Sequence, residues 1–195
     1  FWDVKQGQVL VRGRDIRDIP LSDLMDQISM VFQKVYLFAD TVENNIKFGC
    51  PNATHEEVVA AAKKACCHDF ILTLPQGYDT VIGEGGSSLS GGEKQRISIA
   101  RAILKDAPIV ILDEATANVD PENEDRLQKA IEALTRDKTI LMIAHRLKTV
   151  RNADQILVLD GGQIVQRGTH SQLMAQEGLY QAFVSGREES GQWKL

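Results

Sequence analysis

Residues 89–120 read LSGGEKQRISIARAILKDAPIVILDEATANVD. They join four features in a fixed order: a turn of small residues, a basic amphipathic helix, a fully apolar strand and a pair of carboxylates. Glycine amides at the start of a helix can approach an anion closely, and a carboxylate at the end of a strand can position a magnesium ion. Each feature alone is a weak signal. Their order predicts a site for a phosphate, a magnesium ion and an attacking water.

Three apolar runs of the sequence are each followed by polar residues. The runs and the residues that follow them are 28–32 with Gln33, 109–112 with Asp113 and Glu114, and 139–144 with His145. Such runs are typical of strands that are buried on both faces of a parallel sheet covered by helices. Ligands of open α/β sheets bind beyond the carboxyl ends of the strands. We therefore expect the four polar side chains to converge on one site.

Helices are expected between these strands and after them. Helix formers and capping residues predict helices at 55–67, 91–105 and 121–134. Two glycines at 161 and 162 predict a β-hairpin between flanking strands. The expected hairpin strands are 156–160 and 163–167. Two short helices are expected after them, at 171–176 and 178–185, and the tail 186–195 is expected to fray. This alternation of strands and helices predicts an α/β fold.

Length and composition fit one domain, or a core with an inserted subdomain. The chain has 195 residues, of which 43% are apolar and 25% charged, and its net charge is −5. This charge gives no broad cationic field, so no nucleic-acid partner is expected. The sequence contains no run of 18 apolar residues, so it predicts no membrane span. The three cysteines lack CxxC spacing, so we expect Cys50, Cys66 and Cys67 to be small buried side chains.

Residues 89–120 resemble the signature and Walker B segment of an ATP-binding cassette (ABC) ATPase, and the resemblance extends over nearly the whole chain. It implies a P-loop NTPase (RecA-like) parallel-sheet core with an inserted α-helical subdomain. The implied division gives 1–33 as core strands up to the Q-loop, 34–105 as the helical subdomain with the signature motif, and 106–195 as the Walker B core, the H-loop and the C-terminal hairpin and helices.

The resemblance assigns nucleotide contacts to the turn before the predicted helix and to the segment after the predicted strand. In the family this turn reaches across a dimer interface to the γ-phosphate that the opposing subunit binds. The implied nucleotide-binding residues are Gln33, Ser90, Gly91, Gly92, Glu93 and Asp120. Glutamate stands at 93 where the commonest family pattern has glutamine, and ANVD replaces the usual SALD before the retained Asp120. Taken alone, the SGG turn would be a plain helix cap.

The resemblance also assigns the catalytic and metal-binding roles. It implies that Asp113 and Gln33 hold magnesium, that Glu114 is the catalytic base and that His145 contacts the γ-phosphate and orients the water. Without the resemblance, the carboxylates would be a strand-terminal cap, the histidine a hydrogen-bonded structural residue and the glutamine an ordinary surface residue. Glu84 has two interpretations that stay open: an acid that faces the coupling helices of a transmembrane domain, or a solvated loop acid.

Residues around 40–49 (DTVENNIKFG) look like exporter-type cassettes, which are fused to or paired with a transmembrane permease. The resemblance therefore implies ATP and Mg²⁺ as cofactors, a second nucleotide-binding domain in a head-to-tail dimer, a permease partner, and a location at the cytoplasmic face of the cell membrane. Related DNA-repair ATPases carry a long coiled coil between the Q-loop and the signature. Residues 34–89 leave no room for one.

No GxxxxGK[ST] motif occurs in the sequence, so the loop that cradles phosphates in this family is absent from it. We therefore expect the chain to be an N-terminally truncated cassette that lacks its Walker A portion. The isolated chain is then expected to bind ATP weakly and to be inactive. The alternative functions are a non-catalytic fragment that acts only in trans and a non-transport ABC ATPase. Nothing in the sequence identifies the transported substrate.

Overall fold

The structure, a computed structural model, describes residues 3–113, 121–143 and 150–191. The chain divides into two units, Phe1–Ile143 and Ala144–Leu195. The predicted site residues Glu114, Asp120 and His145 lie outside the described residues. Gln33, Asp113 and the turn at 90–93 lie within them, all in the first unit.

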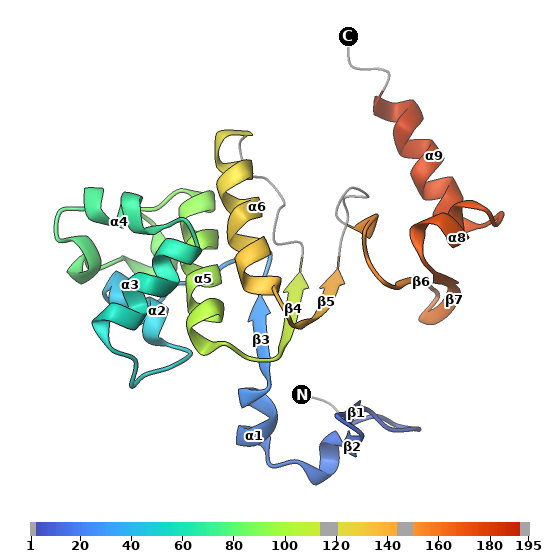
Figure 1. Cartoon of the computed structure of the whole chain (residues 1–195), viewed down its shortest axis with the longest axis horizontal. Coiled ribbons are helices and arrows are strands. Elements are labelled where there is room, and N and C mark those ends of the chain that lie inside the picture. The colour runs from blue at the N-terminus through green and yellow to red at the C-terminus, as the bar shows by residue number, and fades with distance from the viewer. Residues whose placement is uncertain (1–2, 114–120, 144–149, 192–195) are drawn as a thin grey trace. The chain divides into compact units, whose positions relative to one another are not determined.

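A parallel three-stranded sheet lies at the centre of the first unit (Figure 1). Its strands are β3 (Ile28–Val31), β4 (Ile109–Asp113) and β5 (Thr139–Ile143), in the order β3-β4-β5. The register pairs Val31 with Leu112 and Asp113 with Ile143, so the carboxyl ends of the three strands lie at the same end of the sheet. The prediction of a parallel α/β core is confirmed.

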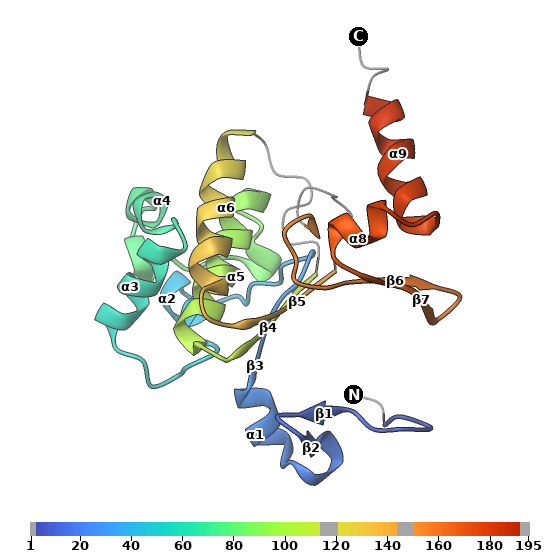
Figure 2. The ribbon, with the colours of Figure 1, turned by 45° about the vertical axis from the view of Figure 1, so that its right-hand side comes forward.

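Only one face of this sheet is buried within the described residues. Val31, Val110 and Leu112 are buried in a core that they share with the helices α5 (Gly91–Lys105) and α6 (Pro121–Thr135). These two helices lie side by side in both views (Figure 1, Figure 2). On the other face, Leu141 and Ile143 are more than half exposed. The expectation of burial on both faces is therefore wrong for the described part, because the helical core covers a single face.

A group of short helices connects β3 to α5 in the chain. They are α2 (Val42–Lys47), α3 (His55–Lys64), α4 (His68–Thr73) and the 3₁₀ turns η2 (Gly77–Asp79) and η3 (Glu84–Gly86). Helices α2 and α3 pack on α5, and α3 also contacts α6. Before β3 come β1 (Leu10–Val11), β2 (Arg14–Asp15), η1 (Ile16–Asp18) and α1 (Leu21–Asp26). The expected helical segment between Gln33 and the signature turn is confirmed.

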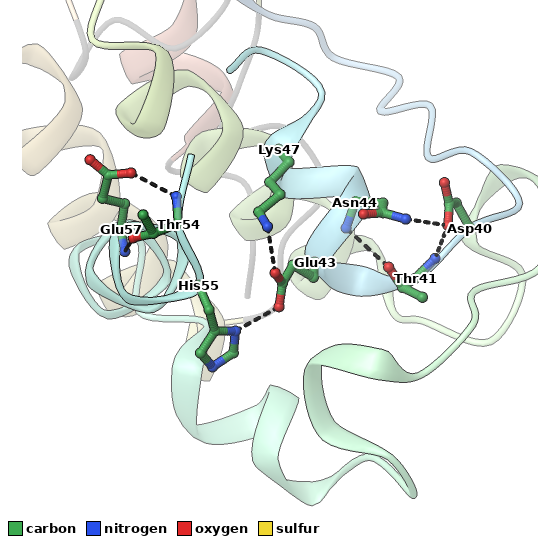
Figure 3. Close-up of polar contacts among 8 residues, drawn as sticks. All are labelled: Asp40, Thr41, Glu43, Asn44, Lys47, Thr54, His55 and Glu57. Carbon is green, nitrogen blue, oxygen red and sulfur yellow. Dashed lines mark hydrogen bonds and ion pairs between the residues drawn. The ribbon is translucent and has the colours of Figure 1, made fainter. Parts of the chain in front are cut away.

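Side-chain caps stabilise the first turns of α2 and α3, with Thr41 and Thr54 as the N-cap residues (Figure 3). The Thr54 hydroxyl accepts a hydrogen bond from the Glu57 amide, and the Glu57 carboxylate accepts one from the Thr54 amide. This reciprocal capping box satisfies two amides that the first turn of a helix leaves without partners. Glu43 of α2 then links the helices, since its carboxylate lies 2.7 Å from Lys47 Nζ and 2.6 Å from His55 Nδ1.

The second unit contains a hairpin and two helices. Strands β6 (Ile156–Asp160) and β7 (Gln163–Gly168) pair antiparallel around Gly161 and Gly162, which both adopt positive φ as a two-residue turn requires. Helices α8 (His170–Met174) and α9 (Leu179–Gly191) follow. The hairpin prediction is confirmed. The tail expected to fray begins at 186, and α9 extends through it to Gly191, so the helix is longer than the predicted 178–185.

The cysteines differ in burial. Cys67 is fully buried, and burial raises the pKa of its thiol to about 12. Cys50 and Cys66 are only partly buried, so the expectation of buried side chains is confirmed for Cys67 alone. Among the described helices, none has both the length and the apolar character needed to cross a bilayer.

Candidate functional site

Two of the predicted site residues lie at the carboxyl ends of neighbouring parallel strands. Asp113 ends β4, and Gln33 lies two residues beyond the end of β3, which is the parallel neighbour of β4. Gln33 is exposed and Asp113 is partly buried. Glu114 and His145 follow β4 and β5 in the sequence, but their positions are outside the described residues.

Asp113 and Gln33 have the chemistry that a magnesium ion accepts. A carboxylate and a side-chain amide are oxygen donors, and Mg²⁺ commonly takes only one or two protein ligands while keeping waters and substrate phosphates. The described residues contain no group of three or more His, Cys, Asp or Glu side chains that could enclose a metal ion. Asp113 and Gln33 could therefore supply the one or two protein oxygens of an ion that also binds a phosphate ligand.

The signature turn (Ser90–Glu93) begins α5 with a capping box. Ser90 Oγ accepts a hydrogen bond from the Glu93 amide at 3.3 Å, and Glu93 Oε2 accepts one from the Ser90 amide at 2.8 Å. The amides of Gly91 and Gly92 remain in the first turn, where an α-helix has no internal acceptor for them. These amides lie at the N-terminal end of the helix, which is the positive end of its dipole, so this turn can bind an anion.

The space beside Gly91 is open. A Cβ atom placed on Gly91 would meet no atom of the described structure within 4 Å. A ligand can therefore approach the backbone at Gly91 without displacing any side chain of the described residues. The carboxylate of Glu93 opposes an anion at the same turn, because it adds negative charge next to the amides. The local chemistry thus combines phosphate-binding donors with one unfavourable charge.

Helix α5 also contacts the segment that carries Gln33. The buried side chain of Gln95 donates to the carbonyl oxygen of Phe32 at 3.4 Å. Gln95 lies in the second turn of α5, and Phe32 immediately precedes Gln33. The structure therefore places the second turn of α5 next to the end of β3.

Sequence reasoning missed a cluster of aromatic side chains near Gln33. We call Tyr36, Phe38 and Phe48 the aromatic surface; they are 54%, 38% and 60% exposed. The rings of Phe38 and Phe48 stack with centroids 4.5 Å apart, and Tyr36 meets Phe38 edge-on at 5.4 Å. A chain with only 6% aromatic residues places three of them within residues 36–48, which is the signal that could have indicated it.

A small cavity adjoins the aromatic surface. Its volume is about 270 Å³, and its lining residues are Phe38, Ala39, Asp40, Asn44, Asn45 and Phe48. The loop with Glu84 lies beside this region, because the Gly85 amide donates to the Leu37 carbonyl at 3.0 Å and Tyr36 Oη lies 3.5 Å from Glu84 Oε1. Exposed aromatic side chains next to a cavity are typical of a protein-docking surface.

Comparison with known proteins gives one consistent result. A family model described as "ABC transporter" matches residues 2–117. The chain is 56% identical over 180 residues to an ATP-dependent lipid A-core flippase of Syntrophus aciditrophicus, which is 92% of this chain and 30% of that protein. It is 52% identical over 185 residues to a putative multidrug export ATP-binding/permease protein of Staphylococcus aureus, which is 95% of this chain and 32% of that protein.

A solved structure is also similar. A bacterial Atm1-family ABC exporter with ATP bound matches with a TM-score of 0.88 and 42% sequence identity, over 95% of this chain and 32% of that chain. The chain thus spans about a third of the length of the relatives that it matches.

Proposed function

The chain belongs to the ABC transporter family, and we propose that it is the ATP-hydrolysing cassette that powers a membrane exporter. The single observation that carries this proposal is the parallel arrangement of β3 and β4, whose ends bring Gln33 and Asp113 to one edge of the sheet beside the start of α5. The names of the relatives describe a flippase and export proteins, which supports export as the direction of transport.

The residues at the strand ends have distinct roles in this proposal. Asp113 and Gln33 hold Mg²⁺, which, when bound, neutralises charge on the phosphates. Glu114 accepts a proton from the attacking water, and His145 orients that water against the γ-phosphate. The support for Glu114 and His145 is their place in the sequence, directly after β4 and two residues after β5.

The signature turn acts in trans on a second nucleotide-binding domain. In this proposal Gly91 and Gly92 donate to a γ-phosphate that the second domain binds, the Ser90 hydroxyl adds a donor, and Asp120 contacts the interface. The open space at Gly91 and the unpartnered position of first-turn amides support this role. Glu93 maintains the turn through its bond to the Ser90 amide. The two domains then face each other head to tail.

The phosphate cradle is the missing part of the site. The sequence contains no GxxxxGK[ST] motif, so ATP binding requires a phosphate loop that these residues do not contain. Following the division that the family resemblance implies, we assign residues 1–33 and 106–195 to the catalytic core and residues 34–105 to a helical subdomain. The alternative, a non-catalytic fragment that acts only through the signature turn, becomes the better proposal if the whole protein fails to hydrolyse ATP.

The aromatic surface is assigned to a transmembrane permease domain. Three exposed rings, the adjacent cavity and the nearby Glu84 offer an apolar docking area with a charged border. The relative from Staphylococcus aureus is named as an ATP-binding/permease protein, which supports this partner. In this proposal the docked cassette lies at the cytoplasmic face of the cell membrane.

The test is the Glu114→Gln substitution in the protein as its gene encodes it, purified with its membrane partner. We expect ATP hydrolysis to fall by about 10²–10⁴-fold, because a general base contributes roughly this factor. Thermal unfolding should not change. Glu177→Gln is the matched control, since Glu177 is exposed in the second unit. Hydrolysis at the unsubstituted rate in Glu114→Gln, or no hydrolysis by the unsubstituted protein, would contradict the proposal.

A further inference from the structure

Arg101 of α5 lies beneath the aromatic surface, where no acidic side chain of the described residues pairs with it. Its Nε donates to the Asn45 carbonyl oxygen at 2.8 Å, and its Nη2 donates to Asn45 Oδ1 at 3.4 Å. The guanidinium carbon lies 5.4 Å from the centroid of Phe48 and 5.8 Å from that of Phe38. No carboxylate of the described residues forms an ion pair with it, and burial lowers the pKa of its guanidinium.

Asn45 connects this guanidinium to the loop that carries Phe38. The Asn45 side chain is 1% exposed. Its Oδ1 accepts from the Phe38 amide at 2.9 Å, and its Nδ2 donates to the carbonyl oxygens of Phe38 and Thr41, each at 3.0 Å. One side chain therefore fixes both ends of the loop from Phe38 to Thr41, which forms one wall of the cavity beside the aromatic surface.

The same helix carries both Arg101 and the signature turn. Residue 101 is eleven positions from Ser90, which corresponds to about 16 Å along an α-helix. Helix α5 is continuous over Gly91–Lys105, and most of its residues are buried. The signature turn and Arg101 therefore lie on one continuous helix, so a rigid-body displacement of α5 would carry both of them.

We propose that Arg101 and Asn45 are positioning residues that hold the aromatic surface in its docking shape and link it to the signature turn through α5. The proposal rests on the proposed function, because it needs a transmembrane domain docked on that surface. Stability alone does not favour a guanidinium here, since no carboxylate of the described residues offsets the hydration that this partly buried charge has lost. A methionine fills similar space without that cost, but it cannot hold two rings and a carbonyl group together.

The test compares Arg101→Met, Arg101→Lys and Phe48→Ala in the membrane-bound protein as its gene encodes it. We expect Arg101→Met to lower kcat for ATP hydrolysis by about 2- to 30-fold, the range of a cation–π contact, with KM for ATP unchanged because Arg101 does not touch the nucleotide site. Its melting temperature should stay close to that of the unsubstituted protein. Arg101→Lys, which keeps a cation beneath the rings, should recover part of the rate.

Arg126→Met is the matched control, because Arg126 is an exposed arginine of α6. The inference fails if Phe48→Ala lowers kcat and Arg101→Met does not. It also fails if Arg101→Met does not fold, since the guanidinium is then a structural requirement. If Phe48→Ala and Arg101→Met both keep the full rate, docking on the aromatic surface is wrong and the proposed partner falls with it, whereas the catalytic proposal is decided separately by Glu114→Gln.

Discussion

The two ends of helix α5 are constructed differently. At its beginning, the side chains of Ser90 and Glu93 each accept a hydrogen bond from the other's backbone amide, and within the described residues the space beside Gly91 is open. Toward its end, Arg101 donates to Asn45, and Lys105 Nζ donates to the carbonyl oxygens of Met25 and Ile28 at 2.8 and 2.9 Å. The late residues bond to segments far away in the sequence, whereas the early ones satisfy themselves locally.

This difference separates two tasks within one helix. The end with Arg101 and Lys105 is fixed to α2 and to the connection between α1 and β3. Next to the signature turn, the described contacts are the buried side chain of Leu89 and the hydrogen bond from Gln95 to Phe32. A site that must meet a ligand on another domain needs free donors in a defined orientation. A helix that is fixed at its C-terminal end and capped by its own residues at its N-terminal end provides both the free donors and their defined orientation.

The largest effect is expected from the middle of α5, which both ends share. Ile97 is fully buried in the main core. Ile97→Ala should lower the free energy of unfolding by about 2–4 kcal/mol, because a buried cavity adds to the lost transfer energy. Urea unfolding of the chain measures it. Ile103→Ala, at a partly buried position of the same helix, should cost less. Equal losses at the two positions would show that the helix is not anchored by its buried middle.

The helix itself was predictable because its signals are local. Ser90 with Glu93 caps its beginning, Asp106 ends it in a left-handed conformation, and the expected bounds 91–105 are those observed. The strands and the hairpin were predictable for the same reason, since apolar runs and a Gly-Gly turn depend on neighbouring residues. Of the candidate site, the parallel register of β3 and β4 shows that Gln33 and Asp113 both lie at the carboxyl ends of neighbouring strands, and their roles stay predictions. The roles of Glu114, His145 and Asp120 stay predictions.

The aromatic surface and the anchors of α5 were not predictable from local patterns. Arg101 meets residues of α2 that are 56 positions away, and Lys105 meets Met25 across 80 positions. A single lysine or arginine on a helix is ordinarily a solvated residue, and only the tertiary fold decides whether it reaches a distant carbonyl group. The exposure of one face of β5 was not predictable for the same reason, because the sequence of an apolar strand does not show which of its faces a helix will cover.

The next effect tests the fixed end of the comparison. Lys105→Met removes two charge-assisted hydrogen bonds to the carbonyl oxygens of Met25 and Ile28. We expect a loss of about 1.5–3 kcal/mol in the free energy of unfolding, the range for hydrogen bonds to a charged group. Urea unfolding measures it, with Lys129→Met on the exposed side of α6 as the control. ATP affinity of the whole protein should not change. A change in affinity without a change in stability would overturn the assignment of Lys105 to the fixed end.

The smallest effect tests the free end. Glu93→Gln keeps a side-chain oxygen for the Ser90 amide, so the capping box and the stability of α5 should be preserved within about 0.5 kcal/mol. The substitution removes a negative charge beside the Gly91 and Gly92 amides. We therefore expect the whole protein to require a roughly two- to fivefold lower ATP concentration for half-maximal hydrolysis, which corresponds to about 0.3–1 kcal/mol at a helix terminus.

Salt dependence distinguishes this charge effect from a change in shape. The advantage of Glu93→Gln should be largest at low ionic strength and should shrink as salt screens the exposed carboxylate. Glu132→Gln, at an exposed position of α6, is the control and should show no such dependence. If the affinity of Glu93→Gln equals that of the unsubstituted protein even at low salt, no phosphate approaches this turn closely. Both ends of α5 would then be structural, and the signature turn would lose its proposed role in trans.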